Sequence, residues 1–201
     1  MIRVLIAEDQ QMLRGALTSL LSFEPDIKVI AEVSDGQKAW EYIQQELPDV
    51  CVLDIEMPHL SGLELAEKIR QANLPCKVMI VTTFARPGYL QKAIDCGVHG
   101  YLLKDEPIDY LIETIRKVMN GEKVVSRDLA ATLFMKEQNP LNEREIAVLQ
   151  LVKVGLTTNE ISKKLFLTKG TIRNYLSTSI QKLHVESRQQ AAQVASDKGW
   201  L

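Results

Sequence analysis

The chain has 201 residues, of which 46% are hydrophobic and 25% charged, so it is long enough to bury one large core or two small ones. No run of 18 apolar residues occurs, which argues against a membrane-spanning helix, and the start MIRVLIAEDQ lacks the pattern of a signal peptide. The three cysteines and three histidines have no metal-binding spacing, which argues against a zinc site. We therefore expect a cytoplasmic protein with no direct membrane insertion.

The charge is unevenly distributed, although the net charge is only −2. Residues 140–201 contain nine Lys or Arg against five Asp or Glu, which gives +4, so the first 139 residues carry −6. An acidic front and a basic tail indicate two modules with different partners.

Strand and helix patterns alternate over residues 1–120. Short apolar runs predict five strands, at 2–7, 27–33, 49–53, 77–82 and 100–104. Apolar residues recur at helical spacing between these runs. Five strand–helix units with continuously apolar strands predict an α/β fold, a doubly wound parallel sheet with helices on both faces.

The stretch 121–139 has a weaker pattern, and we interpret it as a connection in which RDLAATLFM could form a short helix. From residue 140 onward the periodicity is only helical. Four short helices are predicted there, and the second and third are joined by a tight turn, which is typical of a helix-turn-helix.

Two capping boxes mark helix starts in this tail. Asn142 stands three residues before Glu145, and Thr157 stands three residues before Glu160. The third helix is predicted over residues 169–182.

Polar residues follow the predicted strands. Glu8 and Asp9 follow the first strand, Asp54 the third, Thr82 the fourth and Lys104 the fifth. The carboxyl ends of parallel strands share one edge of a sheet, where ligands bind in this fold class. Alone, each residue could be a helix cap, a strand end or a solvated charge. Together they predict a Mg²⁺ site in which Asp54 accepts a phosphoryl group.

The motifs AED (7–9), LDIEMP (53–58), VTT (81–83) and GYLLKD (100–105) resemble those of response-regulator receiver domains. The resemblance implies a (βα)5 flavodoxin/CheY-like fold and a sensor histidine kinase, membrane-bound, as partner. It also implies site roles. Asp54 is the phosphoacceptor, Thr82 and Lys104 contact the phosphoryl group, and Tyr101 is the switch aromatic. The implied Mg²⁺ ligands are Glu8, Asp9, Asp54 and the backbone carbonyl of Glu56.

The tail motifs LNEREIAVLQLVKVGLTTNEIS and GTIRNYLSTSIQKL resemble the LuxR-type helix-turn-helix of the NarL/FixJ family. The resemblance implies an all-α four-helix domain that binds double-stranded DNA, with its recognition helix in the major groove. The residues expected to contact DNA are Lys163, Lys164, Lys169, Thr171, Arg173, Asn174, Ser177, Thr178 and Lys182. The simpler alternative is that these cations form the solvated face of a small bundle.

The two resemblances imply a receiver domain at 1–120, a linker at 121–139 and a DNA-binding domain at 140–201. Phosphorylation would drive homodimerisation and binding to a two-fold or direct-repeat promoter site. The candidate dimer residues are Met12, Leu13, Leu17, Tyr110 and Leu111, although a core role is the simpler interpretation of the leucines. The segments AEDQQML, DVCVLDIEMP and TTFARPGY resemble DesR-type regulators, which suggests membrane-lipid or envelope-stress genes as targets.

Three alternatives compete with this hypothesis. The chain could be a receiver-type regulator that acts without phosphorylation. It could be a phosphatase with an aspartyl nucleophile, but such an enzyme would need Asp-x-Asp after its first strand. It could be a ligand-gated LuxR regulator, but its front domain needs its apolar residues for the sheet and helices. We expect no enzyme activity beyond slow autodephosphorylation.

Overall fold

A computed structural model describes residues 1–83, 87–126, 129–130 and 139–201. These residues form two compact units, the second of them built essentially from residues 139–201. The segments TTFARPGY and RDLAATLFM fall partly on residues 84–86, 127–128 and 131–138, which lie outside the described residues.

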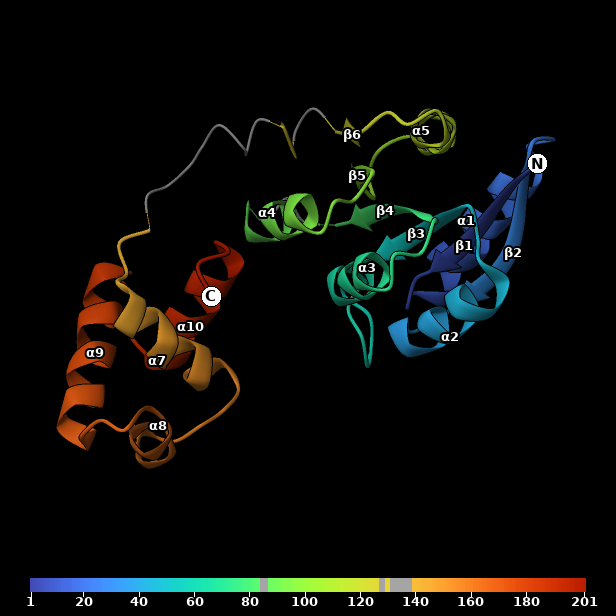
Figure 1. Cartoon of the computed structure of the whole chain (residues 1–201). Coiled ribbons are helices and arrows are strands. Elements are labelled where there is room, and N and C mark those ends of the chain that lie inside the picture. The colour runs from blue at the N-terminus through green and yellow to red at the C-terminus, as the bar shows by residue number, and fades with distance from the viewer. Residues whose placement is uncertain (84–86, 127–128, 131–138) are drawn as a thin grey trace. The chain divides into compact units, whose positions relative to one another are not determined.

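The first unit contains a parallel sheet in the strand order β2-β1-β3-β4-β5-β6 (Figure 1). All five predicted strands are present, and the predicted doubly wound α/β fold is confirmed. The strands are β1 (Ile2–Ala7), β2 (Ile27–Val33), β3 (Val50–Asp54), β4 (Lys77–Thr82), β5 (Gly100–Leu103) and β6 (Val124–Val125). The order reverses direction between β1 and β3, and this switch point is where such sheets bind ligands.

The sixth strand, β6, lies in the stretch that the sequence predicted to be a connection. It pairs in parallel with β5. The N–H of Val124 donates to the carbonyl of His99 at 2.9 Å, and the N–H of Ser126 donates to the carbonyl of Tyr101 at 3.0 Å. The sheet therefore extends at least to Ser126.

Helices cover the sheet because alternate strand residues point to opposite faces. Val4, Ile6, Val50 and Val52 share one buried cluster with apolar residues of α1 and α5. The helices of this unit are α1 (Gln11–Ser22), α2 (Gly36–Glu46), α3 (Gly62–Gln71), α4 (Pro87–Asp95) and α5 (Ile108–Met119).

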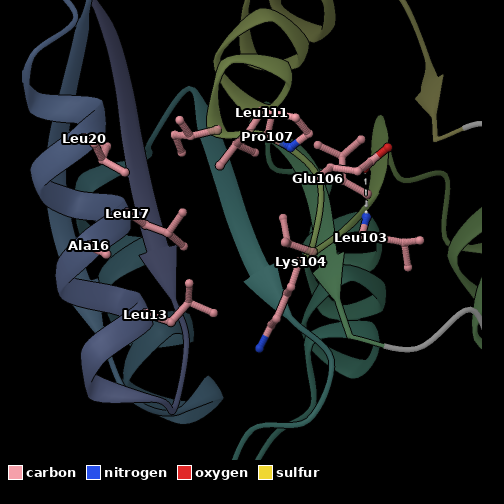
Figure 2. Close-up of a pocket in the computed structure, with 12 residues that line it drawn as sticks. Leu13, Ala16, Leu17, Leu20, Leu103, Lys104, Glu106, Pro107 and Leu111 are labelled. Atoms are coloured by element: carbon pink, nitrogen blue, oxygen red, sulfur yellow. Dashed lines mark hydrogen bonds between the residues drawn. The ribbon is translucent and has the colours of Figure 1, made fainter.

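A cavity of about 160 Å³ lies between α1 and α5. Figure 2 shows Leu13 and Leu17 of α1 facing Leu111 and the segment around Lys104 across this cavity. Most of its lining is apolar, and the stem of Lys104 forms part of its wall.

The second unit contains α7 (Glu143–Lys153), α8 (Thr158–Leu165), α9 (Lys169–Lys182) and α10 (Arg188–Asp197). Both predicted capping boxes form, with Asn142 and Thr157 as the N-caps of α7 and α8. The four helices enclose a core that includes Leu149, Ile161 and Ile172. The predicted all-α helix-turn-helix is thereby confirmed. In the part of the chain described here, no helix has the length and apolar character needed to cross a membrane.

Candidate functional site

Strand geometry brings the predicted acidic residues together. Asp54 is the last residue of β3, Glu8 follows β1, and Lys104 follows β5. Because these strands are parallel, their carboxyl ends meet at one edge of the sheet. Asp54 is only 5% exposed, and Glu8 is also buried. A buried carboxylate needs a partner, since burial of an uncompensated charge is strongly unfavourable.

Lys104 is that partner. Its Nζ lies 3.0 Å from Oδ2 of Asp54 and 2.8 Å from Oε2 of Glu8. Burial raises the pKa of Glu8 and the charge of Asp54 adds to this rise, although the hydrogen bond from Lys104 acts against it. Burial alone would lower the pKa of Lys104, but its hydrogen bonds to Glu8 and Asp54 raise that pKa above the ordinary value. The ammonium therefore stays charged between the two acids.

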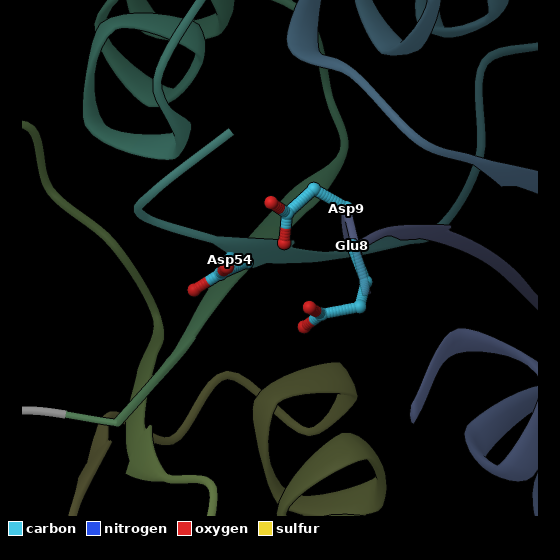
Figure 3. A group of neighbouring side chains, drawn as sticks. All are labelled: Glu8, Asp9 and Asp54. Atoms are coloured by element: carbon cyan, nitrogen blue, oxygen red, sulfur yellow. The ribbon is translucent and has the colours of Figure 1, made fainter. Parts of the chain in front are cut away.

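Three carboxylates also lie close enough to share a cation. Each of Glu8, Asp9 and Asp54 offers a carboxylate oxygen, and these oxygens all lie within 4.8 Å of one another (Figure 3). Asp9 is exposed, so the cluster is open to solvent. A set of carboxylate oxygens suits a hard cation such as Mg²⁺.

A cavity of about 80 Å³ opens at this edge of the sheet. It brings together most of the residues that the sequence predicted for the phosphoryl site. Its lining consists of Asp9, Gln10, Asp54, Glu56, Thr82, Thr83 and Lys104. Glu8 is connected to this cavity through its ion pair with Lys104, which lines it.

A close backbone approach shapes the loop after Asp54. The N–H of Gly62, the first residue of α3, donates to the carbonyl of Ile55 at 3.1 Å. A Cβ at position 62 would lie only 2.1 Å from the carbonyl oxygen of Asp54. Glycine is therefore required where α3 begins against the end of β3.

The two predicted switch residues lie on neighbouring strands. Thr82 is buried at the end of β4, and its carbonyl accepts the N–H of Lys104 at 2.8 Å. The ring of Tyr101 is buried within the unit and does not line the 80 Å³ cavity.

Two contacts to Glu8 were missed by sequence reasoning. Nη1 of Arg14 donates to the carbonyl of Glu8 at 2.7 Å, and the N–H of Gln10 donates to Oε1 of Glu8 at 3.2 Å. Gln10 is the N-cap of α1 and Arg14 lies within the helix, but neither residue type signals this role. They hold the loop that carries Glu8 and Asp9.

The residues predicted for a dimer interface are divided between surface and core. Met12 is 89% exposed on α1. Leu13 and Tyr110 are partly buried against the core, and Leu17 and Leu111 belong to the core itself. The simpler interpretation of these two leucines, as core residues, is therefore confirmed.

Most residues predicted to contact DNA are exposed on α8 and α9. The exposed residues are Lys163, Lys164, Lys169, Arg173, Asn174, Ser177 and Thr178. Ile172 and Leu176 are buried on the opposite side of α9. This arrangement leaves one polar, cationic face on the helix at 169–182.

The side chains of three of the predicted DNA residues have partners inside the described second unit, among them Thr178, whose hydroxyl donates to the carbonyl of Asn174 at 3.0 Å. The hydroxyl of Thr171 lies 2.9 Å from the hydroxyl of the N-cap Thr168. Nζ of Lys182 donates to both carboxylate oxygens of Glu145, at 2.8 and 3.0 Å. The charge of Lys182 is thus already neutralised by a residue of α7.

Comparisons with known proteins agree with this geometry. Residues 4–116 match the response regulator receiver domain, and residues 139–195 match the LuxR family of bacterial regulatory proteins. The first match covers Glu8, Asp9, Asp54 and Lys104. The second covers all of α7, α8 and α9.

Full-length relatives have the same organisation. The uncharacterized transcriptional regulatory protein YvfU and the transcriptional regulatory protein DesR, both of Bacillus subtilis, are 49% and 48% identical over 201 residues, covering 100% of each chain. The solved response regulator ChrA of a heme-sensing two-component system is 32% identical, with a TM-score of 0.60, and the match covers 100% of this chain and 98% of that one. The chain therefore belongs to the NarL family of two-component response regulators, DNA-binding transcription factors in which a receiver domain precedes a LuxR-type helix-turn-helix.

Proposed function

We propose that phosphorylation of Asp54 by a sensor histidine kinase switches this transcription factor to its DNA-binding state. In this proposal residues 1–120 act as the receiver, 121–139 as the linker and 140–201 as the DNA-binding domain, in the cytoplasm. The observation that carries the proposal is the position of Lys104, whose Nζ lies 3.0 Å from Asp54 and 2.8 Å from Glu8 at an open edge of the sheet.

The transfer itself requires one nucleophile and one leaving group. A carboxylate oxygen of Asp54 attacks the phosphorus of a phosphohistidine on the kinase, and a P–O bond forms as the P–N bond breaks. The released imidazole leaves neutral after taking a proton from solvent, and Asp54 becomes an acyl phosphate. Lys104 then stabilises the added negative charge.

Mg²⁺ fits the carboxylates present. Glu8, Asp9 and Asp54 would hold it, with the backbone carbonyl of Glu56 as a further ligand. When bound, the ion supplies positive charge that offsets repulsion between the carboxylates and the incoming phosphoryl group. Lys104 neutralises part of the same cluster, so ammonium and ion compete for the same carboxylates.

The response to phosphorylation would pass through the neighbouring strands. Thr82 is one strand away from Asp54, and its hydroxyl could donate to a phosphoryl oxygen. A shift of Thr82 would act on Tyr101 of β5, whose buried ring packs within the same unit. The receiver would then favour a dimer through α1 and α5, where Met12 is the most exposed of the candidate residues.

A receiver dimer would present two helix-turn-helix units to one promoter. The exposed face of α9 would enter the major groove, where Arg173 can pair with guanine and Asn174 with adenine. A two-fold or direct-repeat DNA site would match two such units. The likeness to DesR-type regulators supports membrane-lipid or envelope-stress genes as the targets.

The test is the oligomeric mass and the DNA affinity of the full chain, with and without a small phosphodonor plus Mg²⁺. We expect the wild type to dimerise and to bind promoter DNA more tightly with the donor, and Asp54→Ala to do neither. Asp95→Ala, which removes an exposed aspartate of α4, is the matched control and should behave like the wild type. Equal DNA binding by wild type and Asp54→Ala under all conditions would instead support a regulator that acts without phosphorylation.

A further inference from the structure

Phe166 is the most exposed large hydrophobic residue among those that the structure describes. Phe166 lies in the turn between α8 and α9, and its side chain is 93% exposed. Figure 1 shows the position of this turn between the two helices. A single exposed apolar side chain is ordinary on a protein surface, so exposure alone would mean little. The backbone and the surrounding charges give this residue its significance.

The backbone at Phe166 adopts a left-handed conformation, with φ 55°. Residues with a Cβ rarely adopt it, and glycine or asparagine is the usual choice. The turn is held by Ser162, whose carbonyl accepts the N–H groups of Phe166 and Leu167 and whose hydroxyl donates to the carbonyl of Leu167 at 2.6 Å. Leu167 packs against the core. The ring of Phe166 is therefore presented to solvent by a fixed turn.

The sequence around Phe166 is rich in cationic residues. No Asp or Glu occurs between Glu160 and Glu186, whereas five Lys or Arg do. Lys163 and Lys164 precede the ring in the last turn of α8, and Lys169 opens α9. All three lysines are exposed. A surface with this charge is complementary to the phosphates of DNA.

We propose that Phe166 is a DNA-contact residue, whose ring packs on the deoxyribose of the strand that borders the recognition helix. The N-terminal residues of a recognition helix lie in the major groove, and Phe166 stands three residues before that helix, at the edge of the groove. Its ring covers apolar sugar surface while the neighbouring lysines pair with phosphates. This contact adds affinity without reading a base edge. The inference rests on the DNA-binding role of the second unit.

The test compares full-length variants by fluorescence anisotropy on a short mixed-sequence DNA duplex, over a series of KCl concentrations, with Mg²⁺ and a small phosphodonor present. Phe166→Asn removes the ring but suits the left-handed backbone, so it should keep the circular dichroism spectrum and melting temperature of the wild type. Phe166→Tyr keeps the ring. Val154→Asn is the matched control, because Val154 is also apolar and exposed, at 66%, but lies at the end of α7.

We expect Phe166→Asn to weaken DNA binding about tenfold at every salt concentration, as for the loss of one apolar contact. Its plot of log affinity against log salt should stay parallel to that of the wild type, because no phosphate contact is lost. Lys163→Ala should instead give a shallower slope. Phe166→Tyr and Val154→Asn should bind like the wild type.

Equal binding by Phe166→Asn and wild type would overturn the assignment of Phe166 and leave the DNA-binding role of the unit intact; the exposed ring would then serve a protein partner. The assignment would also be overturned if Val154→Asn weakened binding as much as Phe166→Asn. Failure of the wild type itself to bind duplex DNA would contradict the DNA-binding role, and with it this inference.

Discussion

Nζ of Lys182, near the end of α9, lies 2.8 Å from Oε2 of Glu145, a carboxylate that is only 1% exposed in the first turn of α7. The same carboxylate accepts the N–H of Asn142 in the capping box. One acidic side chain thus joins the start of α7 to the end of α9. The pair gives Lys182 a structural role beside the predicted contact with the DNA backbone.

The first prediction concerns this pair. Lys182→Met leaves the buried charge of Glu145 without its cation and should lower the free energy of unfolding by about 2 kcal/mol. The double variant with Glu145→Gln should recover most of this loss, because glutamine can still complete the capping box. Urea unfolding measures both effects. Lys163→Met, at an exposed site, should change stability by less than about 0.5 kcal/mol, and a similar value for Lys182→Met would contradict the prediction.

The second prediction concerns competition between ammonium and metal at the acidic cluster. Asp9→Asn removes a charged oxygen ligand and should weaken Mg²⁺ binding about tenfold. Lys104→Met should have the opposite effect and tighten binding about tenfold, because Glu8 and Asp54 lose the cation that now neutralises them. Isothermal titration calorimetry with MgCl₂ measures both affinities.

Lys123→Met serves as the control for charge removal, because Lys123 is exposed and directly precedes β6, which pairs with the start of β5, whereas Lys104 follows the end of β5. It should leave the Mg²⁺ affinity unchanged. Weaker Mg²⁺ binding by Lys104→Met would show that the lysine supports the ion instead of competing with it.

The third prediction compares two glycines. Gly62→Ala places a Cβ 2.1 Å from the carbonyl oxygen of Asp54 and should lower stability by about 2 kcal/mol, because backbone must move. In Gly15→Ala the added Cβ meets nothing within 4 Å, in the middle of α1, and should raise stability by about 0.5–1 kcal/mol. Thermal or urea unfolding distinguishes them. A Gly62→Ala variant as stable as the wild type would contradict the close approach of α3 to β3.

The fourth prediction concerns pH and His99. Burial lowers the pKa of His99, and the nearby charges of Lys77 and Lys123 add to this effect. Nδ1 also accepts the N–H of Val78 at 3.2 Å, which requires that nitrogen to be unprotonated. The folded chain therefore binds the proton less readily than the unfolded chain does.

The contribution of neutral His99 to stability should be intact above the pKa of the unfolded chain, about 6.5. It should be lost as the pH falls through the lower pKa of the folded chain. In His99→Asn the amide oxygen can accept the same N–H but does not titrate. On acidification the wild type should therefore lose more stability than His99→Asn does. Urea unfolding at neutral and acidic pH tests this, and a constant difference would contradict it.

The fold could be predicted closely because β3, β4 and β5 are apolar runs that end at or directly before polar residues, and β1 and β2 are largely apolar. β1, β2 and β4 begin and end at the predicted residues, and so does α9. β6 could not be predicted, since Val124 and Val125 form a strand only by pairing with Gly100 and Tyr101. A run of two residues is too short to show the alternation of apolar and polar residues that identifies a strand.

The candidate site was predictable to a similar degree, because parallel strands bring their carboxyl ends to one edge. That rule was enough to group Asp54, Glu8 and Lys104. It could not predict the hydrogen bond from Arg14 to the carbonyl of Glu8 or the ion pair of Lys182 with Glu145. Both contacts depend on how helices pack against their neighbours. Charge alone did not distinguish Lys182 from the other lysines predicted to contact DNA.

The first unit continues beyond the short strand β6, because Leu129 is fully buried and the N–H of Ala130 donates to the carbonyl of Ser126 at 2.9 Å. The N–H of Ser126 in turn donates to the carbonyl of Tyr101, the candidate switch residue. From Ala130 to Asn139 the chain advances by 9 residues, which can span at most roughly 30 Å. In the proposed DNA-binding state, a connection of this length would keep each α9 at a high effective concentration near its receiver. Two paired receivers would then reach only half-sites within this radius, so the length of the connection limits the usable spacing between half-sites.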